Sequence, residues 1–529
     1  MIEADEHYWF TERALLGMLA IAEQLGDERV CARPELPGAN SAYGLVTHCL
    51  GVLEYWAGHL VAGRTIERDR PAEFAATGSV AQLRAAVQAG LAQFRADLAG
   101  FDPTAPPRFP TDAAFLGPER ELTQNGVLLH VLEELAQHHG HLEVLRDALV
   151  GNRPAQPPFA PSIDWLQAKQ GVKWHRPGPD RLPAWVADMD FPVAEPIRAA
   201  ITAALDRGDL GYPDWPQHPL AEPFAQRMST RFGWTPDPAH VRGLTDVIQG
   251  LQIVTELVTS PGDGVVLAVP NYPPFLASVP RQGRQIVPLA LDDGRWDLAR
   301  LERDLATTGA PLLLLVNPHN PSGRVFTRDE LEQLADLALR RDLLVVSDEI
   351  HADLTYDGYQ HVPFASLSPE VAARTVTLTS ATKAYNIAGL RAAVAHVGPD
   401  ELRARWDACP PDLFGAVNVL GVEATRAAWE QGDGWLAAVR SHLAEQRARL
   451  GARLASLPVR YVPPQATYLA WLEFPELPGD AAEFFRRAGV ELSAGPEYGG
   501  RPSQARLNFA TSAAVLEEIL DRMASVLEA

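Results

Sequence analysis

The spacing of apolar residues divides the chain into two parts that we expect to fold differently. Over residues 1–150, apolar positions recur at helical intervals, as they do between Val127 and Leu145. Four apolar patterns of this kind predict an all-α, antiparallel four-helix bundle, because each helix must bury its apolar stripe against its neighbours.

In the second part, short apolar runs rich in leucine and β-branched residues predict buried parallel strands. Their approximate positions are 265–269, 312–316, 343–347, 375–379 and 392–397. A series of such strands predicts an α/β fold with a doubly wound, mainly parallel sheet in its large domain.

A proline-rich stretch joins the two parts and predicts a linker. We expect the linker to be followed by an enzyme made of a large domain and a smaller α/β domain. The expected boundaries are 1–150 for the bundle, 151–162 for the linker and 163–529 for the enzyme, with the large domain at about 205–430 and the small domain at about 163–204 and 431–529.

Three short polar motifs follow one another in the second half of the chain. They are Asn-Pro-His-Asn-Pro-Ser-Gly-Arg at 317–324, Ser-Asp-Glu-Ile-His at 347–351, and Ser-Ala-Thr-Lys at 380–383, with Arg391 eight residues later. Asp348 and Lys383 come at the carboxyl ends of predicted strands, where ligands bind in open α/β sheets. We therefore expect the two side chains to face one crevice.

The residue types in these motifs match the needs of pyridoxal 5'-phosphate. A desolvated amine on Lys383 has a lowered pKa and can react with the cofactor's aldehyde, which makes this lysine the catalytic candidate. Asp348 can keep the pyridine nitrogen protonated, and Asn320 can donate a hydrogen bond to the ring's 3'-oxygen. Hydroxyls and a guanidinium for the phosphate are supplied by Ser380, Thr382 and Arg391.

Each motif alone has a simpler interpretation. An aspartate after an apolar strand is more commonly a turn or cap residue, and the Asn-Pro motif alone would be a turn cluster. Ser380 and Lys383 also fit the Ser-x-x-Lys pattern of serine β-lactamases, but no Lys-Thr-Gly follows them in this chain. The order and spacing of the three motifs together favour the cofactor site.

Residues from about 162 to 529 resemble the fold-type I pyridoxal-phosphate enzymes of the aminotransferase class I/II superfamily. Within it they are most similar to the MalY/PatB group of cystathionine β-lyases. The motifs that carry the resemblance lie at 185–191, 211–212, 272–275, 317–325, 347–353, 386–390, 466–468 and 506–510.

The resemblance implies roles that spacing does not reveal. It implies that Tyr272 stacks on the cofactor ring and that Arg506 binds the substrate α-carboxylate in a bidentate pair. It also implies that Tyr212 reaches the phosphate in the neighbouring subunit, so that the active unit is a homodimer. The remaining expected cofactor contacts are His351, Val247 and Ile248.

One position departs from the group's pattern. Where the group usually has Gly-Val-Val, whose backbone N–H groups bind the phosphate, this chain has Asp246 before Val247 and Ile248. A carboxylate near an anion is unfavourable unless it points away or caps the following helix. The backbone donors survive either way, so the cofactor prediction stands.

The resemblance favours β-elimination over amino transfer. Its substrate would be an amino acid with a sulfur on the β-carbon, and the products would be a thiol, pyruvate and ammonia. Both reactions use the same catalytic residues, so the preference depends on the contexts at 185–191 and 347–353, which most aminotransferases lack. An aminotransferase with a structural or binding bundle remains the alternative.

The first part of the chain carries a candidate metal site. Glu134 and His138 share a helix face at i and i+4, and His48 can approach from an earlier helix. Helical histidines are more often not ligands, but three protein ligands with an open position are typical of catalytic zinc. We also count His141, one turn beyond, as a candidate.

The same residues resemble the DinB-like superfamily, in a branch of unknown function related to mycothiol- and bacillithiol-dependent S-transferases. The similarity covers residues 1–150 and includes His48 and the helix at 130–141. It implies that His48, Glu134 and His138 bind a divalent metal (Zn, Ni or Fe) and that a low-molecular-weight thiol is a partner. One chain would then handle thiol adducts and cleave their carbon–sulfur bonds.

Composition narrows the remaining possibilities. A formal net charge of −21 argues against nucleic acid or anionic membranes as partners. No apolar run approaches the ~20 residues that span a bilayer, and the first residues do not match a signal peptide. Three scattered cysteines form no disulfide framework, so we expect a reducing, cytoplasmic setting.

Overall fold

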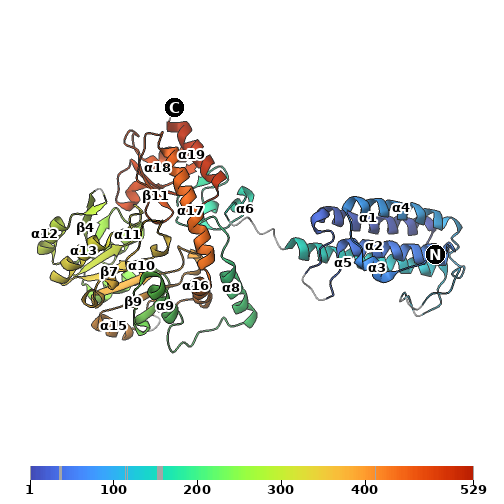
Figure 1. The fold of residues 1–529 in the computed structure, drawn as a ribbon, viewed down its shortest axis with the longest axis horizontal. Helices are drawn as coiled ribbons and strands as arrows, with labels where there is room; N and C mark the ends of the chain where they lie inside the picture. The colour runs from blue at the N-terminus through green and yellow to red at the C-terminus, as the bar shows by residue number, and fades with distance from the viewer. Residues whose placement is uncertain are drawn as a thin grey trace. The chain divides into compact units, whose positions relative to one another are not determined.

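The computed structural model describes the whole chain except residues 1, 35–37, 113–114, 116, 119, 152–158, 293, 411–412 and 528–529. It forms two compact units, Met1–Ala155 and Gln156–Ala529, which are treated separately below (Figure 1). Most of the predicted linker at 151–162 lies outside the described residues.

The first unit is helical. Ser41 and Ser79 begin two of its helices by accepting hydrogen bonds from the backbone N–H groups of Gly44 and Gln82. The helices pack around one apolar core that contains Trp56. Their bounds are α1 Ala4–Arg29, α2 Ala42–Val52, the π-helical continuation η1 Leu53–Val61, α3 Arg70–Ala75, α4 Val80–Asp97, η2 Leu98–Gly100 and α5 Gln124–Gly151.

The second unit contains, in the part the structure describes, an eight-stranded sheet in the order β2-β9-β8-β7-β6-β3-β4-β5. The bounds are β2 Val241–Leu244, β3 Gly264–Val269, β4 Gln285–Asp292, β5 Arg295–Trp296, β6 Leu312–Val316, β7 Leu344–Asp348, β8 Thr375–Thr379 and β9 Ala393–Val397. The runs predicted from leucine and β-branched residues correspond to β3, β6, β7, β8 and β9.

The sheet is mixed, with a parallel centre and antiparallel strands at its edges. Strands β8, β7, β6, β3 and β4 pair in parallel. In contrast, β9 is antiparallel to both β8 and β2, and β5 is antiparallel to β4. An apolar run shows that a strand is buried but does not encode its direction, so the prediction was incomplete on this point.

Alternate residues of the central strands face opposite sides of the sheet, and helices cover both faces. Val265 and Leu267 belong to one core together with residues of α10 and α11, whereas Val266 belongs to a second core with residues of α12 and α13. The bounds of these helices are α10 Val247–Val258, α11 Pro273–Arg281, α12 Leu298–Thr308 and α13 Arg328–Arg340.

A smaller four-stranded antiparallel sheet has the order β10-β11-β14-β13, beside the parallel pair β1-β12. The strand bounds are β1 Leu182–Pro183, β10 Arg460–Tyr461, β11 Leu469–Glu473, β12 Val490–Glu491, β13 Ser493–Ala494 and β14 Gln504–Asn508. The remaining α-helices are α6 Ile163–Gln167, α7 Val172–His175, α8 Glu195–Arg207, α9 Ala221–Phe232, α14 Pro369–Ala372, α15 Asp400–Asp407, α16 Val419–Gln431, α17 Asp433–Leu454, α18 Ala481–Arg487 and α19 Ala513–Leu527.

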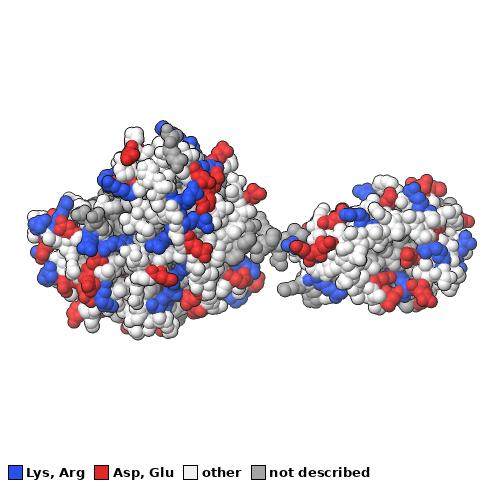
Figure 2. All heavy atoms as spheres, turned by 45° about the horizontal axis from the view of Figure 1, so that its top comes forward, with Lys and Arg blue, Asp and Glu red and all other residues white. Residues whose placement is uncertain are grey.

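Acidic and basic side chains are interspersed on the face drawn in Figure 2, over both units. Among the described residues, no helix is both long enough and apolar enough to cross a membrane.

The packing of α13 gives a stability prediction. Leu334 is fully buried in the core beneath α13, whereas Leu339 on the same helix is 40% exposed. Leu334→Ala should lower the free energy of unfolding by about 2–5 kcal/mol because it leaves a cavity. The matched variant Leu339→Ala should change it by less than about 0.5 kcal/mol. Chemical denaturation of both variants measures the difference, and equal losses would contradict the assigned core.

Candidate active site and metal centre

The carboxyl ends of three adjacent parallel strands meet at one cavity. Asp348 ends β7, Lys383 follows β8, and Asn320 follows β6. The cavity has an empty volume of about 760 Å³. Its lining includes Val247, Ile248, Tyr272, Asn320, Asp348, His351, Ser380, Thr382, Lys383 and Arg391. The structure therefore brings most of the predicted cofactor residues together.

Asp348 is the acidic group of the cavity. It is 3% exposed, and its Oδ1 accepts a hydrogen bond from the backbone N–H of Ile350 at 3.1 Å. Burial raises the pKa of Asp348 to about 7, against the smaller opposing effects of that hydrogen bond and of Lys383. A cationic partner in the cavity, such as a protonated ring nitrogen, would stabilise the carboxylate.

Lys383 is a basic group of the same lining. Its Nζ donates a hydrogen bond to the carbonyl oxygen of Ala187 at 2.8 Å, and the Tyr468 hydroxyl donates to the same oxygen at 2.9 Å. Burial lowers the pKa of the Lys383 amine, although Asp188 acts in the other direction. A lowered pKa increases the fraction of neutral, nucleophilic amine near pH 7.

Part of the cavity lining is suited to an anion. The start of α10 lies here, with Val247 and Ile248 in its first turn, and helix N-termini favour negative charge. Ser380 Oγ lies 2.8 Å from Thr382 Oγ1. Hydroxyls and backbone N–H groups thus gather where the sequence predicted a phosphate.

Asp246 resolves the departure from the group's pattern. Its Oδ1 accepts a hydrogen bond from Gln249 N at 2.8 Å and so caps α10. Its Oδ2 pairs with Arg391, whose side chain is 60% exposed. The Asp246 carboxylate therefore caps the helix, and its charge is balanced by Arg391, which the sequence predicts to bind the phosphate.

Tyr272 belongs to the cavity lining, whereas Arg506 contacts the lining residue Asn320 without being part of the lining. Arg506 is 3% exposed and donates hydrogen bonds to Asn320 Oδ1 at 3.0 Å and to the carbonyl oxygen of Trp185 at 2.8 Å. Its Nε has no hydrogen-bond partner among the described residues. Tyr272 is partly buried in the cavity wall, where burial raises the pKa of its hydroxyl. The roles that the resemblance implied for these two residues stay predictions.

Two other predicted cofactor residues lie in opposite environments, since His351 is buried and Tyr212 is exposed. His351 is 2% exposed, and its Nδ1 has no hydrogen-bond partner within the described part of the chain. Burial, with smaller contributions from Lys383 and Arg506, lowers the pKa of His351 to about 3, so its ring is neutral. Tyr212 is fully exposed and does not line the cavity.

Residues 185–191 form a strap beside Lys383, a role that the sequence does not reveal. Each carbonyl oxygen of this strap accepts a hydrogen bond from a side chain elsewhere in the unit. The donors, in chain order of the side chains, are Lys169, Lys173, Lys383, Asn386, Tyr468, Ser493, Arg506 and Asn508. Motif similarity singled out the strap, but backbone acceptors leave no residue-type signature in a sequence.

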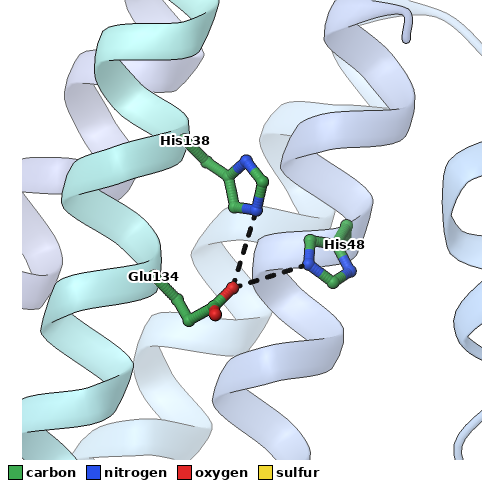
Figure 3. Close-up of side chains that lie close together, drawn as sticks. All are labelled: His48, Glu134 and His138. Carbon is green, nitrogen blue, oxygen red and sulfur yellow. Dashed lines mark ion pairs between the residues drawn. The ribbon is translucent and has the colours of Figure 1, made fainter. Parts of the chain in front are cut away.

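The helical unit brings together three of the four predicted metal ligands. His48 comes from α2, and Glu134 and His138 come from successive turns of α5, with all three side chains turned toward one another (Figure 3). One ligand atom from each lies within 4.8 Å of the others. His141 is exposed and lies outside this group, with its ring centre 6.1 Å from that of His138.

The spacing of these atoms suits an ion better than direct hydrogen bonds. Glu134 Oε2 lies 3.9 Å from His48 Nε2 and 3.6 Å from His138 Nε2, beyond hydrogen-bond distance. His48 is 2% exposed, and its Nε2 has no hydrogen-bond partner among the described residues. The imidazoles of His138 and His48 lower the pKa of Glu134, which keeps it ionised. Imidazole nitrogens and a carboxylate are a donor set that binds divalent zinc, nickel or iron.

Comparison with known proteins finds a family match for each unit. The model of the family described as aminotransferase class I and II matches residues 186–523, and that of mycothiol-S-transferase matches residues 9–151. Cystathionine beta-lyase PatB of Bacillus subtilis is 37% identical over 376 residues, which cover 68% of this chain and 97% of that protein.

Two solved structures extend the similarity to the fold. The crystal structure of OvoB is 39% identical, with a TM-score of 0.65, over 68% of this chain and 96% of that chain. The PLP-bound C-S lyase from Staphylococcus hominis is 28% identical, with a TM-score of 0.64, over the same shares of 68% and 96%. The chain therefore belongs to the aminotransferase class I and II family, with cystathionine beta-lyases among its relatives, and carries a mycothiol-S-transferase domain ahead of the enzyme domain.

Proposed function

We propose that the second unit is a pyridoxal 5'-phosphate-dependent β-lyase acting on cystathionine or other cysteine S-conjugates. The observation that carries the proposal is the pair formed by a buried carboxylate, Asp348, and an amine of lowered pKa, Lys383, in one cavity. The names of the similar lyases support the reaction, and the sequence contexts at 185–191 and 347–353 favour it over amino transfer.

The cavity residues fit the cofactor. Asp348 lacks a cation in contact with its buried carboxylate among the described residues, and a pyridinium nitrogen would supply one. Ser380, Thr382 and the start of α10 would bind the phosphate, and Asn320 and His351 would contact the ring oxygen. When bound, the cofactor supplies an electron sink for negative charge at the substrate α-carbon.

The chain's own residues would carry the proton transfer and the positioning. Arg506 would hold the substrate α-carboxylate, and Tyr272 would cover the ring face. Lys383 Nζ would take the α-proton, after which the bond between the β-carbon and sulfur breaks and the thiolate leaves with its electron pair. The aminoacrylate product then hydrolyses to pyruvate and ammonia.

We propose a homodimer as the active unit. Tyr212 is fully exposed in one chain, as expected for a residue that serves the phosphate site of a partner subunit. An aromatic side chain that contacts a bound cofactor is normally well buried, so the full exposure of Tyr212 in a single chain fits a site completed by a partner subunit.

We further propose that the first unit is an antiparallel four-helix bundle that binds a divalent metal and handles a low-molecular-weight thiol. The cluster of His48, Glu134 and His138 carries this second proposal, together with the match to mycothiol-S-transferase. A metal with an open position lowers the pKa of a bound thiol and so generates a thiolate. The pairing of units suggests that one chain processes thiol adducts of electrophiles.

Replacement of Lys383 tests the lyase. Lys383→Ala should lower pyruvate release from L-cystathionine by at least about 10²-fold, because the variant loses its proton-transfer group. Arg374→Ala removes a cation that is 46% exposed, lies just before β8 and does not line the cavity, so this control should keep most of the activity. Turnover that requires a keto acid and gives no pyruvate would move the assignment to aminotransferase.

Asp348 should make the stability of the cofactor-free protein depend on pH. Its pKa is about 4 in an unfolded chain and rises to about 7 on burial, so the folded state binds the proton more tightly. Stability from this group is present below pH 4 and is lost as pH rises toward 7, by about 1.4 kcal/mol per pKa unit.

Asp348→Asn should therefore be more stable than wild type at pH 8 without cofactor, and should gain less from added cofactor. Thermal unfolding across pH, with and without pyridoxal 5'-phosphate, measures both effects. Asp342→Asn removes an exposed carboxylate just before the same strand and serves as the control. A cofactor gain equal to that of wild type would contradict the role of Asp348.

Replacement of His138 tests the metal proposal separately. His138→Ala should abolish stoichiometric zinc binding, because it removes one of three ligands, while pyruvate release from cystathionine stays within about twofold. His141→Ala should leave zinc binding unchanged, since His141 lies outside the cluster. Elemental analysis after dialysis measures the bound metal, and retention of metal by His138→Ala would contradict the assigned ligands.

A further inference from the structure

A buried ion pair between Arg68 and Glu73 contacts Nδ1 of His48, the ring nitrogen that faces away from Glu134. Glu73 Oε2 lies 2.7 Å from His48 Nδ1, on the ring edge opposite the cluster. Arg68 holds the same carboxylate at both oxygens, with Nε 2.7 Å from Oε1 and Nη2 3.0 Å from Oε2. The side chains of Arg68 and Glu73 are only 3% and 10% exposed. Neither residue belongs to the ligand group of the cluster.

The ion pair determines which nitrogen of His48 carries the proton. Arg68, whose guanidinium is always charged, holds both oxygens of Glu73, so this carboxylate is ionised. An ionised carboxylate only accepts hydrogen bonds, so His48 Nδ1 donates to Glu73 Oε2 at 2.7 Å, while Arg68 Nη2 lies farther from the same nitrogen, at 3.4 Å. The lone pair of a neutral ring then lies on Nε2, which faces Glu134 and is the buried atom without a partner among the described residues.

The helix that carries His48 is shaped to admit this carboxylate. Gly51 lies one turn after His48, and a Cβ at that position would collide with Glu73 Oε1. Gly44, seven residues earlier, lies against the carbonyl oxygen of Phe74, which would be 2.8 Å from a Cβ there. The Phe74 ring stacks on the His48 ring, with centres 4.2 Å apart and planes at 25°. The glycines let the segment containing Glu73 and Phe74 approach the back of the histidine.

We propose that Glu73, held by Arg68 and admitted by Gly51, is a positioning residue for the metal centre. It fixes His48 as the Nδ1–H tautomer and aims Nε2 at the ion, as carboxylates behind metal-binding histidines do. Arg68 neutralises the Glu73 charge, so the ion is balanced by the single ligand carboxylate of Glu134. The inference rests on the proposed metal function of the first unit and extends it beyond the three ligands.

The test compares zinc affinity and cobalt spectra in the full chain. Glu73→Gln keeps the side-chain shape but cannot provide a carboxylate, and Gly51→Ala displaces the carboxylate from a different direction. Both variants should bind Zn²⁺ about 10–100-fold more weakly in competition with a chromophoric chelator. The visible bands of bound Co²⁺ should also shift, because they report ligand geometry and would not respond to a simple loss of stability.

A matched control removes a carboxylate beside the site without touching His48. Glu133 neighbours Glu134 in sequence, its side chain is 59% exposed, and its only described ion pair is with His130. Glu133→Gln should keep wild-type zinc affinity and cobalt bands. Circular dichroism establishes that each variant is folded, and Gly51→Ala carries the comparison if Glu73→Gln does not fold.

The outcomes separate the inference from the proposed function. If wild type binds zinc and both Glu73→Gln and Gly51→Ala match it in affinity and spectrum, the positioning role is overturned while the metal site stands. If wild type binds neither Zn²⁺ nor Co²⁺, the metal function fails and the positioning role fails with it. Weakening in the two variants alone, with shifted cobalt bands, supports the role of Glu73.

Discussion

Removal of water from ionisable groups at the ends of parallel strands is the constraint on which this structure depends. Asp348 and Lys383 reach the cavity because β7 and β8 are adjacent, parallel and buried on both faces. The backbone groups of the two strands are hydrogen-bonded within the sheet, so burial acts mainly on the side chains. It raises the pKa of Asp348 and lowers that of Lys383, which favours the neutral form of each group. The helices on either face of the sheet exclude water and so maintain those shifts.

Much of this arrangement could be predicted from the sequence because its signals are local. The runs that became β3, β6, β7 and β8 are continuous and apolar, and Asp348 and Lys383 follow directly from where two of them end. The direction of β9 and the existence of β2 and β5 were not predictable in this way. Those strands are short or take their direction from the partners they pair with, which is a property of the folded chain.

The site residues also fall into those with a local sequence signal and those brought together only by folding. Helical spacing predicted that Glu134 and His138 share a face, and it added His141 as a further candidate, because periodicity does not tell which turn faces the neighbouring helix. Glu73 gave no signal, since it is distant in sequence from the cluster and meets His48 only after α3 packs on α2. The strap at 185–191 contributes backbone oxygens, which every sequence possesses. The resemblance to known families added expected roles for Arg506 and Tyr272, which local patterns do not indicate and which stay predictions.

The ion pair between Asp246 and Arg391 has a consequence for how the cavity acquires its cofactor. Arg391 is already paired with a carboxylate at the edge of the anion-binding end, in a partly exposed position. If Arg391 binds the cofactor phosphate, as the sequence predicts, the incoming phosphate must compete with the Asp246 carboxylate for the guanidinium or share it. Loading is thus an exchange of anions, and its kinetics should respond to ionic strength, since mobile salt ions screen the resident pair and the arriving phosphate to different extents.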